Sequence, residues 1–589
     1  MRFAKRKGVL FLLFLFTALA AIAVTAMPAA LSADDSQVLQ AAPINPAFED
    51  YIKNMEKIAG GDRALAQEYS YGYRPPTVNL SYIESTRGLN SSNMQAAGAD
   101  LIELPANFSW RTPTNRVTSV KNQSPCGTCW TFGNTNVMES RVWISGGAEN
   151  ANYSEQAVNC CTDPCWTALA ADRCNNGGND FKAQDTFIKK GARQELCQPY
   201  NTGTINTQAC LTCTPAYQTT NFVWVAYIDT TTAARDAIKY AIQTYGPVTV
   251  AYYSNPSCYY SGHKYYYTGT SNPNHLVSIV GWDDTVTHPS GGGSGAWLAK
   301  NSWGGTWGNS GYFWMCYGKA RATDFGSLRA VKAYTSAEKL YYWDEAGWVN
   351  SCGYVGATTA WMANIFTASP AGNLTHVDFY ATTAYEHYDI RVYKSGNINS
   401  LGTAVTFHTG TCGNAPGYYS IPLNTPVELS NGQAFTVVVK MTTNGYTYPL
   451  SYERVVTGCN PAIQAGKSYI SSSGSGWTDL ATSTLHGNVC LRARVTSVPA
   501  RPTVLYPRIP GTSITLRWGA VPTATRYWLQ VNDEIDFTGT WKYSNNALTT
   551  NYATATGFAN LDNKIWYWRV RAGNAGWSTS WSDVQRFRN

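Results

Sequence analysis

The uneven distribution of the cysteines divides this chain into regions. Of the 15 cysteines, 11 lie between residues 104 and 333 and four lie between 336 and 497. The last ~90 residues contain none, and a chain of 589 residues is too long for one compact domain. We therefore expect several folding units, with the cysteine-rich regions as separate ones.

The N-terminus predicts export. Basic residues at positions 2–7 precede an apolar stretch from Gly8 to Ala26, and small residues suited to cleavage end at Ala26 and Ala33. Residues 1–33 therefore have the pattern of a signal peptide. An uncleaved membrane anchor is the alternative, because the apolar stretch is nearly long enough to cross a bilayer. Either way the rest of the chain is predicted to be secreted or extracellular.

The cysteine count adds a chemical clue. In an exported chain cysteines pair by default, and an odd number leaves one thiol over as a candidate reactive residue. Cys210 and Cys213 have the spacing of a zinc half-site, but no second pair completes it, so we expect no metal and no cofactor. The net charge of +7 is weak and no long basic run follows the N-terminus, which gives nucleic-acid binding no support.

Residues 34–103 are polar and contain no cysteine. A helix is predicted from Pro46 to about Ile58, and Pro75 to Leu80 is predicted to be extended, because proline restricts itself and the residue before it. The segment is too thin to bury a core of its own. We interpret it as a pro-segment or a strap across another domain, with a disordered tether as the alternative.

Residues 104–333 change from helical to strand-like character. Apolar residues recur at helical spacing from Trp130 to Ile144, and the pattern repeats from Ala233 to Tyr245. Strand-like runs follow at 248–253, 276–282, 296–299 and 312–316. Helices first and strands second favour an α+β domain with two lobes.

The rest of the chain is all-β in character. Tyr388 to Tyr393 alternates with period two and Phe435 to Met441 has the pattern of a buried strand, which favours a β-sandwich over 336–497. Its four cysteines would form two disulfides. Strand-like runs recur over 499–589, where a second all-β sandwich is expected.

The candidate chemistry lies in the cysteine-rich region. Cys129 stands at the start of a predicted helix, where unpaired N–H groups and the helix dipole stabilise a thiolate. A thiolate needs a proton-transfer partner, and His275 at the start of an apolar strand is the candidate. The amide of Asn301 could orient that imidazole, which completes a Cys/His/Asn set.

These residues stand in motifs that resemble the papain family of cysteine peptidases. The motifs, in order along 104–330, are Gln123 to Trp130, Cys174 to Gly178, Asn274-His275, Trp297 to Gly304 and Gly311 to Phe313. The resemblance implies a helical lobe and a β-barrel lobe, with Cys129 and His275 facing each other across a cleft. It also implies an oxyanion hole formed by the Gln123 side chain and the Cys129 N–H group.

Further positions follow from the same resemblance. The implied substrate-binding positions are Gly177, Gly178, Ala251, Pro273, Asn274 and Trp303, the last of which would also cover the bond between His275 and Asn301. Disulfides are implied between Cys126 and Cys174 and between Cys160 and Cys210. For the second bond, Cys161, Cys197 and Cys213 are close competitors.

The sequence departs from the family pattern in three places. Thr128 stands where Ser or Ala is usual, which puts little in doubt. Asp283 to Gly295 is a polar, glycine-rich insertion that is expected to bulge as a surface loop. Asn179-Asp180 follows Gly178 where many relatives have an aromatic residue and proline, so the primary specificity stays open.

The C-terminal regions carry weaker resemblances. Residues 336–497 are similar to the lectin-like domain that follows the protease in many bacterial and archaeal papain relatives. Its tryptophans could stack on sugars or pack in the core; they are Trp348, Trp361 and Trp477. Residues 499–589 resemble a fibronectin type III module, with Trp518 as the core tryptophan and with Leu561 and Tyr567 fitting the tyrosine corner.

Together these patterns predict a secreted cysteine endopeptidase that hydrolyses peptide or protein substrates through an acyl-enzyme on Cys129. Its C-terminal modules would attach it to a glycan, a protein or a cell surface. The alternative is an adhesion or glycan-binding protein with an inactive protease domain, against which the retention of the catalytic set argues. A transpeptidase or amidase is a weaker third option. We also expect part of 34–103 to dock on the protease, with Pro75 to Leu80 close to the cleft.

Overall fold

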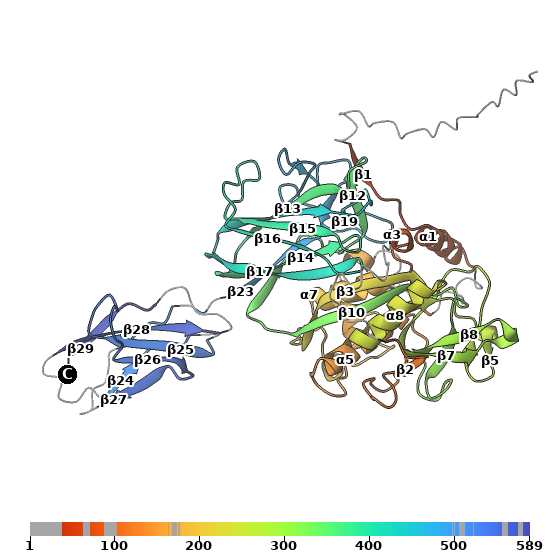
Figure 1. Ribbon diagram of the computed structural model, residues 1–589, viewed down its shortest axis with the longest axis horizontal. Helices are drawn as coiled ribbons and strands as arrows, with labels where there is room; N and C mark the ends of the chain where they lie inside the picture. Colours follow the sequence, from red (N-terminus) through yellow and green to blue (C-terminus); the bar gives the residue numbers. More distant parts are fainter. Residues whose placement is uncertain are drawn as a thin grey trace, which may run out of the picture.

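The computed structural model describes most of the chain that follows the expected signal peptide, which itself lies outside the described residues. The described residues are 38–62, 71–86, 103–162, 164–167, 173–174, 177–497, 499, 501–505, 513–521, 524–556, 564–574 and 581–588. No helix among them is both long and apolar enough to cross a bilayer. Figure 1 shows a mixed helix and strand body, a β-rich body packed on it and a smaller β unit near the C-terminus.

The N-terminal segment runs across both large bodies. It contains β1 (Leu39–Ala41), α1 (Pro46–Ala59) and α3 (Ile83–Thr86). The helix predicted from Pro46 is confirmed as α1, which begins where the Asn45 side chain accepts a hydrogen bond from Ala47 N. β1 pairs with β12 (Asn350–Tyr354) of the β-rich body. The segment therefore takes its order from docking on the rest of the chain.

The helices of the first body are α5 (Cys129–Ile144), α6 (Glu155–Cys161), α7 (Asp180–Lys189) and α8 (Thr232–Tyr245). α5 and α8 confirm the two helices predicted in this region. α5 is buried on nearly all sides, so its ends are held by packing as well as by backbone hydrogen bonds. The start of α5 is thereby a rigid position in the fold.

The strands of the first body form a continuous sheet. They are β2 (Asn107–Ser109), β3 (Tyr217–Ile228), β4 (Val248–Tyr252), β5 (Tyr259–Tyr260), β6 (Lys264–Tyr265), β7 (His275–Thr287), β8 (Ser294–Lys300), β9 (Tyr312–Cys316) and β10 (Thr323–Ala333). The order is β3-β10-β4-β7-β8-β9-β6-β5, with β2 beside β7. The four strand-like runs of the sequence correspond to β4, β7, β8 and β9.

The insertion at 283–295 is a hairpin extension and not a surface loop. β7 continues through it to Thr287, which pairs with Ser294 at the start of β8. Polar side chains do not prevent backbone pairing where one face of a hairpin meets solvent. The loop prediction was wrong for this reason.

The β-rich body contains thirteen strands. They are β11 (Glu338–Tyr341), β12, β13 (Thr359–Thr367), β14 (Gly372–Ala381), β15 (His387–Tyr393), β16 (Thr406–Thr411), β17 (Gly417–Leu429), β18 (Ala434–Thr442), β19 (Leu450–Arg454), β20 (Ser468–Ser471), β21 (Thr478–Asp479), β22 (Gly487–Val489) and β23 (Leu491–Ser497). Three sheets result: β11-β23-β14-β17, β16-β15-β18-β13-β20-β21 and β1-β12-β19-β22.

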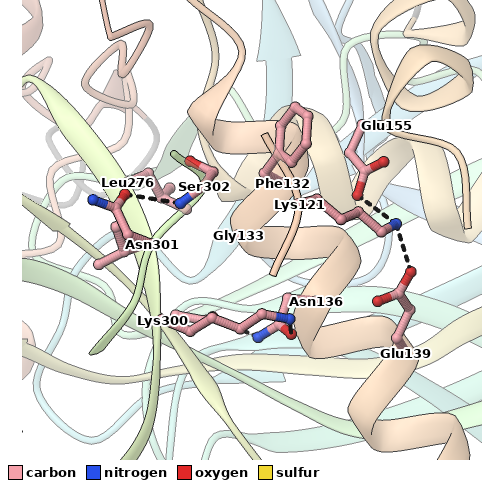
Figure 2. Close-up of a pocket in the computed structure, with 12 residues that line it drawn as sticks. Lys121, Phe132, Gly133, Asn136, Glu139, Glu155, Leu276, Lys300, Asn301 and Ser302 are labelled. Atoms are coloured by element: carbon pink, nitrogen blue, oxygen red, sulfur yellow. Dashed lines mark hydrogen bonds and ion pairs between the residues drawn. The ribbon is translucent and has the colours of Figure 1, made fainter. Parts of the chain in front are cut away.

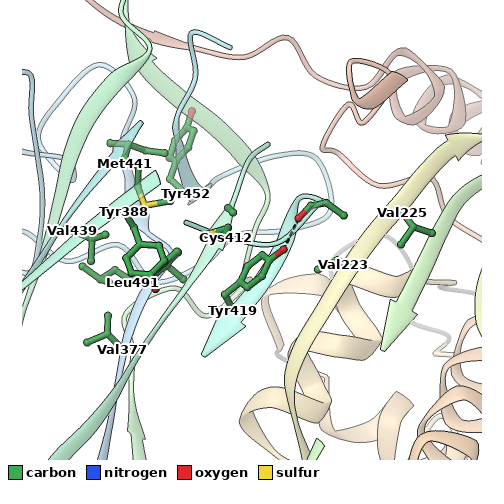
Figure 3. Packing of buried hydrophobic residues seen from close by; sticks show 14 of the residues in the cluster. Val223, Val225, Val377, Tyr388, Cys412, Tyr419, Val439, Met441, Tyr452 and Leu491 are labelled. Atoms are coloured by element: carbon green, nitrogen blue, oxygen red, sulfur yellow. Dashed lines mark hydrogen bonds between the residues drawn. The ribbon is translucent and has the colours of Figure 1, made fainter. Parts of the chain in front are cut away.

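The first of these sheets is continuous with the sheet of the first body. β17 pairs with β3 from Gly417 opposite Val223 to Tyr419 opposite Asn221. Gly417 is required there, because a Cβ atom would lie 2.2 Å from Phe222 O. Buried residues of both bodies form one hydrophobic cluster, part of which Figure 3 shows. The two bodies are therefore fused through backbone pairing and a shared core.

The C-terminal unit has a core of its own. Its strands are β24 (Ser513–Arg517), β25 (Arg526–Asn532), β26 (Tyr543–Leu548), β27 (Tyr552–Thr556), β28 (Ile565–Gly573) and β29 (Gln585–Arg588). They form the sheets β24-β27 and β26-β25-β28-β29 around Trp518, Trp566 and Trp568. Leu561 of the expected tyrosine corner lies outside the described residues, and Tyr567 is half-buried on β28.

The disulfides agree only in part with the expected pairs. Cys126 is joined to Cys174, the pair that the resemblance implied. Cys210 is joined to Cys161, so the pairing with Cys160 was wrong; the two neighbours on α6 point in different directions, which the sequence alone does not distinguish.

The pairing of the other cysteines also differs from expectation, both at the zinc-like spacing and in the β-rich body. Cys213 is joined to Cys197, so both cysteines of the zinc-like spacing lie in disulfides. The four cysteines between 336 and 497 do not pair with one another, so the two bonds expected among them were also wrong. Cys352, Cys412 and Cys490 are separately buried in the β-rich body.

Candidate active site

The thiol of Cys129 lies at the first residue of α5 and is fully buried. The N-cap residue, Thr128, does not cap with its side chain; its hydroxyl instead lies 2.7 Å from the Tyr200 hydroxyl. The first N–H groups of the helix are therefore open to other partners. The backbone N of Leu276 donates to Cys129 Sγ at 3.4 Å, which brings the thiol against the start of β7.

His275 is held by a residue of the neighbouring strand. β7 and β8 pair side by side, so Asn301, which follows β8, lies next to His275 although 26 residues separate them. Asn301 Oδ1 lies 2.8 Å from His275 Nε2, and the Trp303 ring stacks on the imidazole at 4.8 Å. His275 Nδ1 is buried and has no hydrogen-bond partner among the described residues.

Two donors converge on one carbonyl oxygen beside Cys129. Gln123 Nε2 donates to Tyr71 O at 3.1 Å and the Cys129 backbone N donates to the same oxygen at 3.3 Å. Ser302 Oγ donates to Gln123 Oε1 at 2.6 Å and thereby fixes the orientation of the amide. This is the geometry of a site that binds the oxygen of a peptide carbonyl.

The carbonyl belongs to the N-terminal segment, which crosses the cleft at Tyr71–Arg74. Gly178 N donates to Gly72 O at 3.0 Å, and Arg74 N donates to Gly178 O at 2.9 Å. Tyr73 N donates to Asn274 O at 3.2 Å. The segment runs parallel to the chain at Gly178. It therefore binds as an added strand on a backbone edge.

The Tyr73 side chain fills a buried pocket. It belongs to the same hydrophobic cluster as Trp130 and Ala251, and its hydroxyl donates to Asp324 Oδ2 at 2.7 Å. Burial raises the pKa of Asp324 to about 6, against the opposing hydrogen bond from Tyr73. Neither Asp324 nor Tyr73 was singled out from the sequence, since no local pattern marks them.

The expected binding positions fall into two groups. Gly178, Ala251, Asn274 and Trp303 lie against Tyr71–Arg74 through the contacts described above, Trp303 with its ring 5.3 Å from that of Tyr71. Gly177 lies against the same segment, since a Cβ there would lie 2.8 Å from Gly72 O, and its own carbonyl accepts a hydrogen bond from Lys182 Nζ. Pro273 is buried, and no contact with the described residues of the segment is found for it.

The stretch that enters the cleft directly precedes Pro75 to Leu80, which was expected to run close to it. Pro75 to Leu80 lies beyond the cleft, where Thr77 Oγ1 donates to Val349 O of the β-rich body. The cleft itself takes the four residues before it. Gly72 explains the choice, because a Cβ there would lie 1.9 Å from Gly127 O, and only glycine allows this approach.

Burial under this segment sets the protonation of the two central groups. It raises the pKa of the Cys129 thiol to about 12. It also lowers the pKa of His275 to about 4, against the opposite effect of the hydrogen bond to Asn301. In the covered site both groups are therefore neutral near pH 7, which is a resting pair and not a thiolate–imidazolium pair.

A buried polar network lies behind the site, between α5 and the strands (Figure 2). Lys121 Nζ donates to Glu139 and Glu155, each at 2.8 Å, and Lys300 Nζ donates to Asn136 Oδ1. Lys300 directly precedes Asn301, so the network fixes the strand end that carries the imidazole partner. A paired and hydrogen-bonded buried cluster of this kind rigidifies its surroundings.

Comparisons with known proteins identify the family of the chain. Residues 104–332 match the family model described as papain family cysteine protease, and residues 340–494 match a lectin like domain. A cathepsin L-like peptidase of Aedes aegypti is 31% identical over 288 residues, which is 45% of this chain and 80% of that protein. The cathepsin B-like cysteine proteinase 3 of Caenorhabditis elegans is 29% identical over 268 residues, 41% of this chain and 69% of that protein. The chain belongs to the papain family of cysteine proteases.

It is a papain-type cysteine peptidase with a β-rich, lectin-like region after the protease domain. A similar solved structure contains the cysteine protease and lectin-like domains of Cwp84, described as a surface layer associated protein of Clostridium difficile. It has a TM-score of 0.63 and 21% identity, and the match covers 78% of this chain and 98% of that chain. At this identity the likeness concerns the fold.

Proposed function

We propose that this chain is an exported endopeptidase in which Cys129 is the nucleophile, His275 the general acid and base, and Asn301 the residue that orients the imidazole. Gln123 and the Cys129 N–H group stabilise the oxyanion. The observation that carries the proposal is the peptide carbonyl of Tyr71, which both donors already bind at 3.1 and 3.3 Å. A substrate carbonyl in the same place would stand directly at the thiol.

The reaction then follows from the geometry. With substrate in the cleft, Cys129 loses its proton to His275 and attacks the carbonyl carbon, and the negative oxygen is held by the two donors. His275 returns the proton to the leaving amine, which departs and leaves a thioester on Cys129. Water, deprotonated by His275, hydrolyses the thioester and restores the thiol.

The experiment replaces the nucleophile. Cys129→Ala in the full chain should abolish peptide hydrolysis while circular dichroism stays unchanged, because the residue is small and the helix start is kept. Labelling of the unmodified, active protein with a thiolate-directed epoxide should modify Cys129. Hydrolysis at a near-parental rate in Cys129→Ala would contradict the proposal. Transfer of the acyl group to added amines in preference to water would favour the transpeptidase alternative.

We also propose that the N-terminal segment keeps the enzyme latent. Tyr71–Arg74 occupies the carbonyl site and the Gly178 edge, so a substrate has no access while it is bound. The segment pairs with the chain at Gly178 in the parallel direction, so that Gly178 bonds to two different residues, Gly72 and Arg74. In antiparallel pairing, one residue would exchange both hydrogen bonds with Gly178. This difference in pairing supports resistance of the segment to cleavage. A form that begins near Leu104 should have a much higher kcat/KM for a small peptide than one that begins near Asp34; equal values would contradict latency.

The β-rich region is proposed to attach the enzyme to a glycan. On the outer face of the six-stranded sheet, Asp389, Lys440 and Trp361 form a row across three neighbouring strands. A hollow of about 160 Å³ opens beside them, and Trp477 and Arg391 also line it. Aromatic faces next to charged and polar groups suit the faces and hydroxyls of a sugar. Trp348, by contrast, is fully buried and takes no part.

Calorimetry of the full chain tests this role. A hexuronic acid oligosaccharide and a neutral glucose oligosaccharide serve as probes, because Arg391 and Lys440 favour an acidic sugar. Binding should be lost in Trp477→Ala and kept in Trp541→Ala, a partly exposed tryptophan of the C-terminal unit. Equal binding by both variants would place the sugar elsewhere.

The C-terminal unit is proposed to be a fibronectin type III module that serves as a spacer, supported by its two sheets and its buried Trp518.

A further inference from the structure

We propose that Cys165 and Cys459 form a disulfide in the exported protein, which fastens the lectin-like region covalently to the protease domain. Their Sγ atoms lie 3.1 Å apart although 294 residues separate them in sequence. Both side chains are buried. A disulfide has an S–S length of about 2.05 Å, so a shift of about 1 Å completes the bond.

The backbone holds both cysteines in place. Cys165 lies in the short 3₁₀ helix Pro164–Thr167, and Asn460 N donates to Cys165 O at 3.1 Å. Cys459 closes a tight turn in which it exchanges two backbone hydrogen bonds with Val456, at 3.0 and 2.9 Å. The sulfur atoms therefore meet between two constrained pieces of chain, one from each body.

A small apolar cluster surrounds the pair. Trp166 comes from the protease side, and Ala346 and Val349 come from the lectin-like side. Trp166 Nε1 donates to Ala346 O at 3.3 Å, which adds a polar contact across the same boundary. Water and soluble reductants have little access to sulfur atoms packed in this way, so a bond formed here persists.

The chemistry balances with a disulfide as oxidant. One cysteine attacks the oxidant as a thiolate, forms a mixed disulfide and releases one thiol of the oxidant. The second cysteine then displaces the other oxidant thiol, so that two electrons and two protons pass from the two cysteines to the oxidant. Since the folded pair is buried, the step belongs to the folding of the exported chain, in a compartment that supplies such oxidants.

The disulfide would also hold the N-terminal segment, Tyr71–Arg74, more firmly in the cleft. Arg74, the last residue of the stretch in the cleft, donates from Nη2 to Thr457 O at 3.1 Å. Its guanidinium lies 5.4 Å from the Trp166 ring centre, on the protease side. The disulfide joins the chain next to Thr457 with the chain next to Trp166, so the two walls around Arg74 cannot separate. This consequence rests on the proposed latency.

Peptide mapping tests the bond directly. The full chain with Cys129→Ala, which removes self-cleavage, is refolded or secreted in the presence of oxidised glutathione, alkylated without reduction and digested. Mass spectrometry should find a linked peptide pair containing Cys165 and Cys459. The pair should be absent in Cys459→Ser and retained in Cys412→Ser, a matched change of a buried cysteine in the same region. Alkylation of Cys459, or its appearance in another disulfide, would overturn the proposal.

A second measurement tests the consequence, with Cys129 present. The lag before peptide hydrolysis begins should be several-fold shorter in Cys459→Ser than in Cys412→Ser, while both reach the same kcat. Equal lags would contradict the claim that the disulfide helps to hold the segment in the cleft, but would not contradict the disulfide itself. A chain that never becomes active in any variant would contradict the proposed peptidase function and leave the disulfide map unaffected.

Discussion

The oxygen site beside Cys129 depends on the placement of one amide. Gln123 Nε2 reaches the bound carbonyl because Ser302 Oγ holds the other end of the same amide at 2.6 Å. The backbone fixes the two residues as well, since Gln123 N donates to Ser302 O at 2.8 Å. The donor is thus pre-oriented toward the place where negative charge would develop in the proposed reaction, which is the requirement for transition-state stabilisation.

Gln123→Ala should therefore lower kcat by about 10²–10³, with little change in KM, because the lost interaction acts on the transition state. Steady-state kinetics with a small peptide on the chain that lacks residues before Leu104 gives both constants. Ser302→Ala is the companion variant: it keeps the donor and removes only its support, so its loss should be smaller. An unchanged kcat in Gln123→Ala would remove this side chain from the mechanism.

The reactivity of Cys129 should depend on whether the segment covers it. Burial raises the thiol pKa to about 12 in the covered chain, so between pH 6 and 9 the thiolate fraction rises steadily and stays small. Alkylation by iodoacetamide, followed by intact mass, should be slow at pH 7 and accelerate with each pH step. Removing the segment admits water, lowers this pKa and raises that of His275, so alkylation becomes fast at pH 7. Equal rates at pH 7 for both forms would contradict the argument.

At the scale of elements, close backbone contacts help to hold the Tyr71–Arg74 stretch in the cleft. Gly72 allows the close approach, with φ of +99° and a backbone neighbour where a Cβ would be. Gly61 has a similar φ of +103° but nothing within 4 Å of the Cβ position. Substitution of the two glycines therefore separates the effect of a steric clash with Gly127 from the effect of the backbone conformation.

Gly72→Ala should release the segment from the cleft and make the uncut chain active, with kcat/KM at least about tenfold above that of the parent, which corresponds to ~1.4 kcal/mol of weakened docking. The measurement is hydrolysis of a small peptide before any cleavage of the chain is seen on a gel. Gly61→Ala serves as the control and should stay latent. Latency in both variants would mean that Gly72 does not determine docking.

At the scale of the whole molecule, the protease domain and the lectin-like region share buried ion pairs as well as a sheet. Arg492 of β23 lies 2.6 Å from Asp185 of α7 and 2.5 Å from Asp344, and all three side chains are nearly or fully buried. Breaking a buried pair leaves an unpaired charge behind. The two regions should accordingly unfold together.

Arg492→Ala should lower the free energy of unfolding by about 3–5 kcal/mol, because Asp344 loses its ion-pair partner in the interior and Asp185 keeps only Lys189. Arg501→Ala, which removes an exposed pair with Asp583, should cost only about 0–1 kcal/mol. Denaturant titration followed by circular dichroism compares them. Similar unfolding midpoints for both variants would show that the buried network contributes no more than a surface pair.

The sequence by itself determined the proposed catalytic set and most of the elements. Cys129, His275 and Asn301 stand in local motifs whose residue types have few other chemical uses, and the structure brings them together as expected. Helices and strands such as α1, α8 and β9 were predicted within a residue or two, because periodicity and terminating glycines are local properties.

Tertiary structure decided what depends on long-range contact. Neighbouring cysteines on α6 look equivalent in sequence, yet helix geometry turns only Cys161 toward Cys210. The cleft is occupied by Tyr71–Arg74, just before the Pro75 to Leu80 stretch that was expected close to it, because Gly72 allows the approach to Gly127, which lies far away in sequence. The fusion of β17 with β3 and the meeting of Cys165 with Cys459 likewise join distant residues. Such contacts are selected by the packing of the whole chain, and no local pattern encodes them.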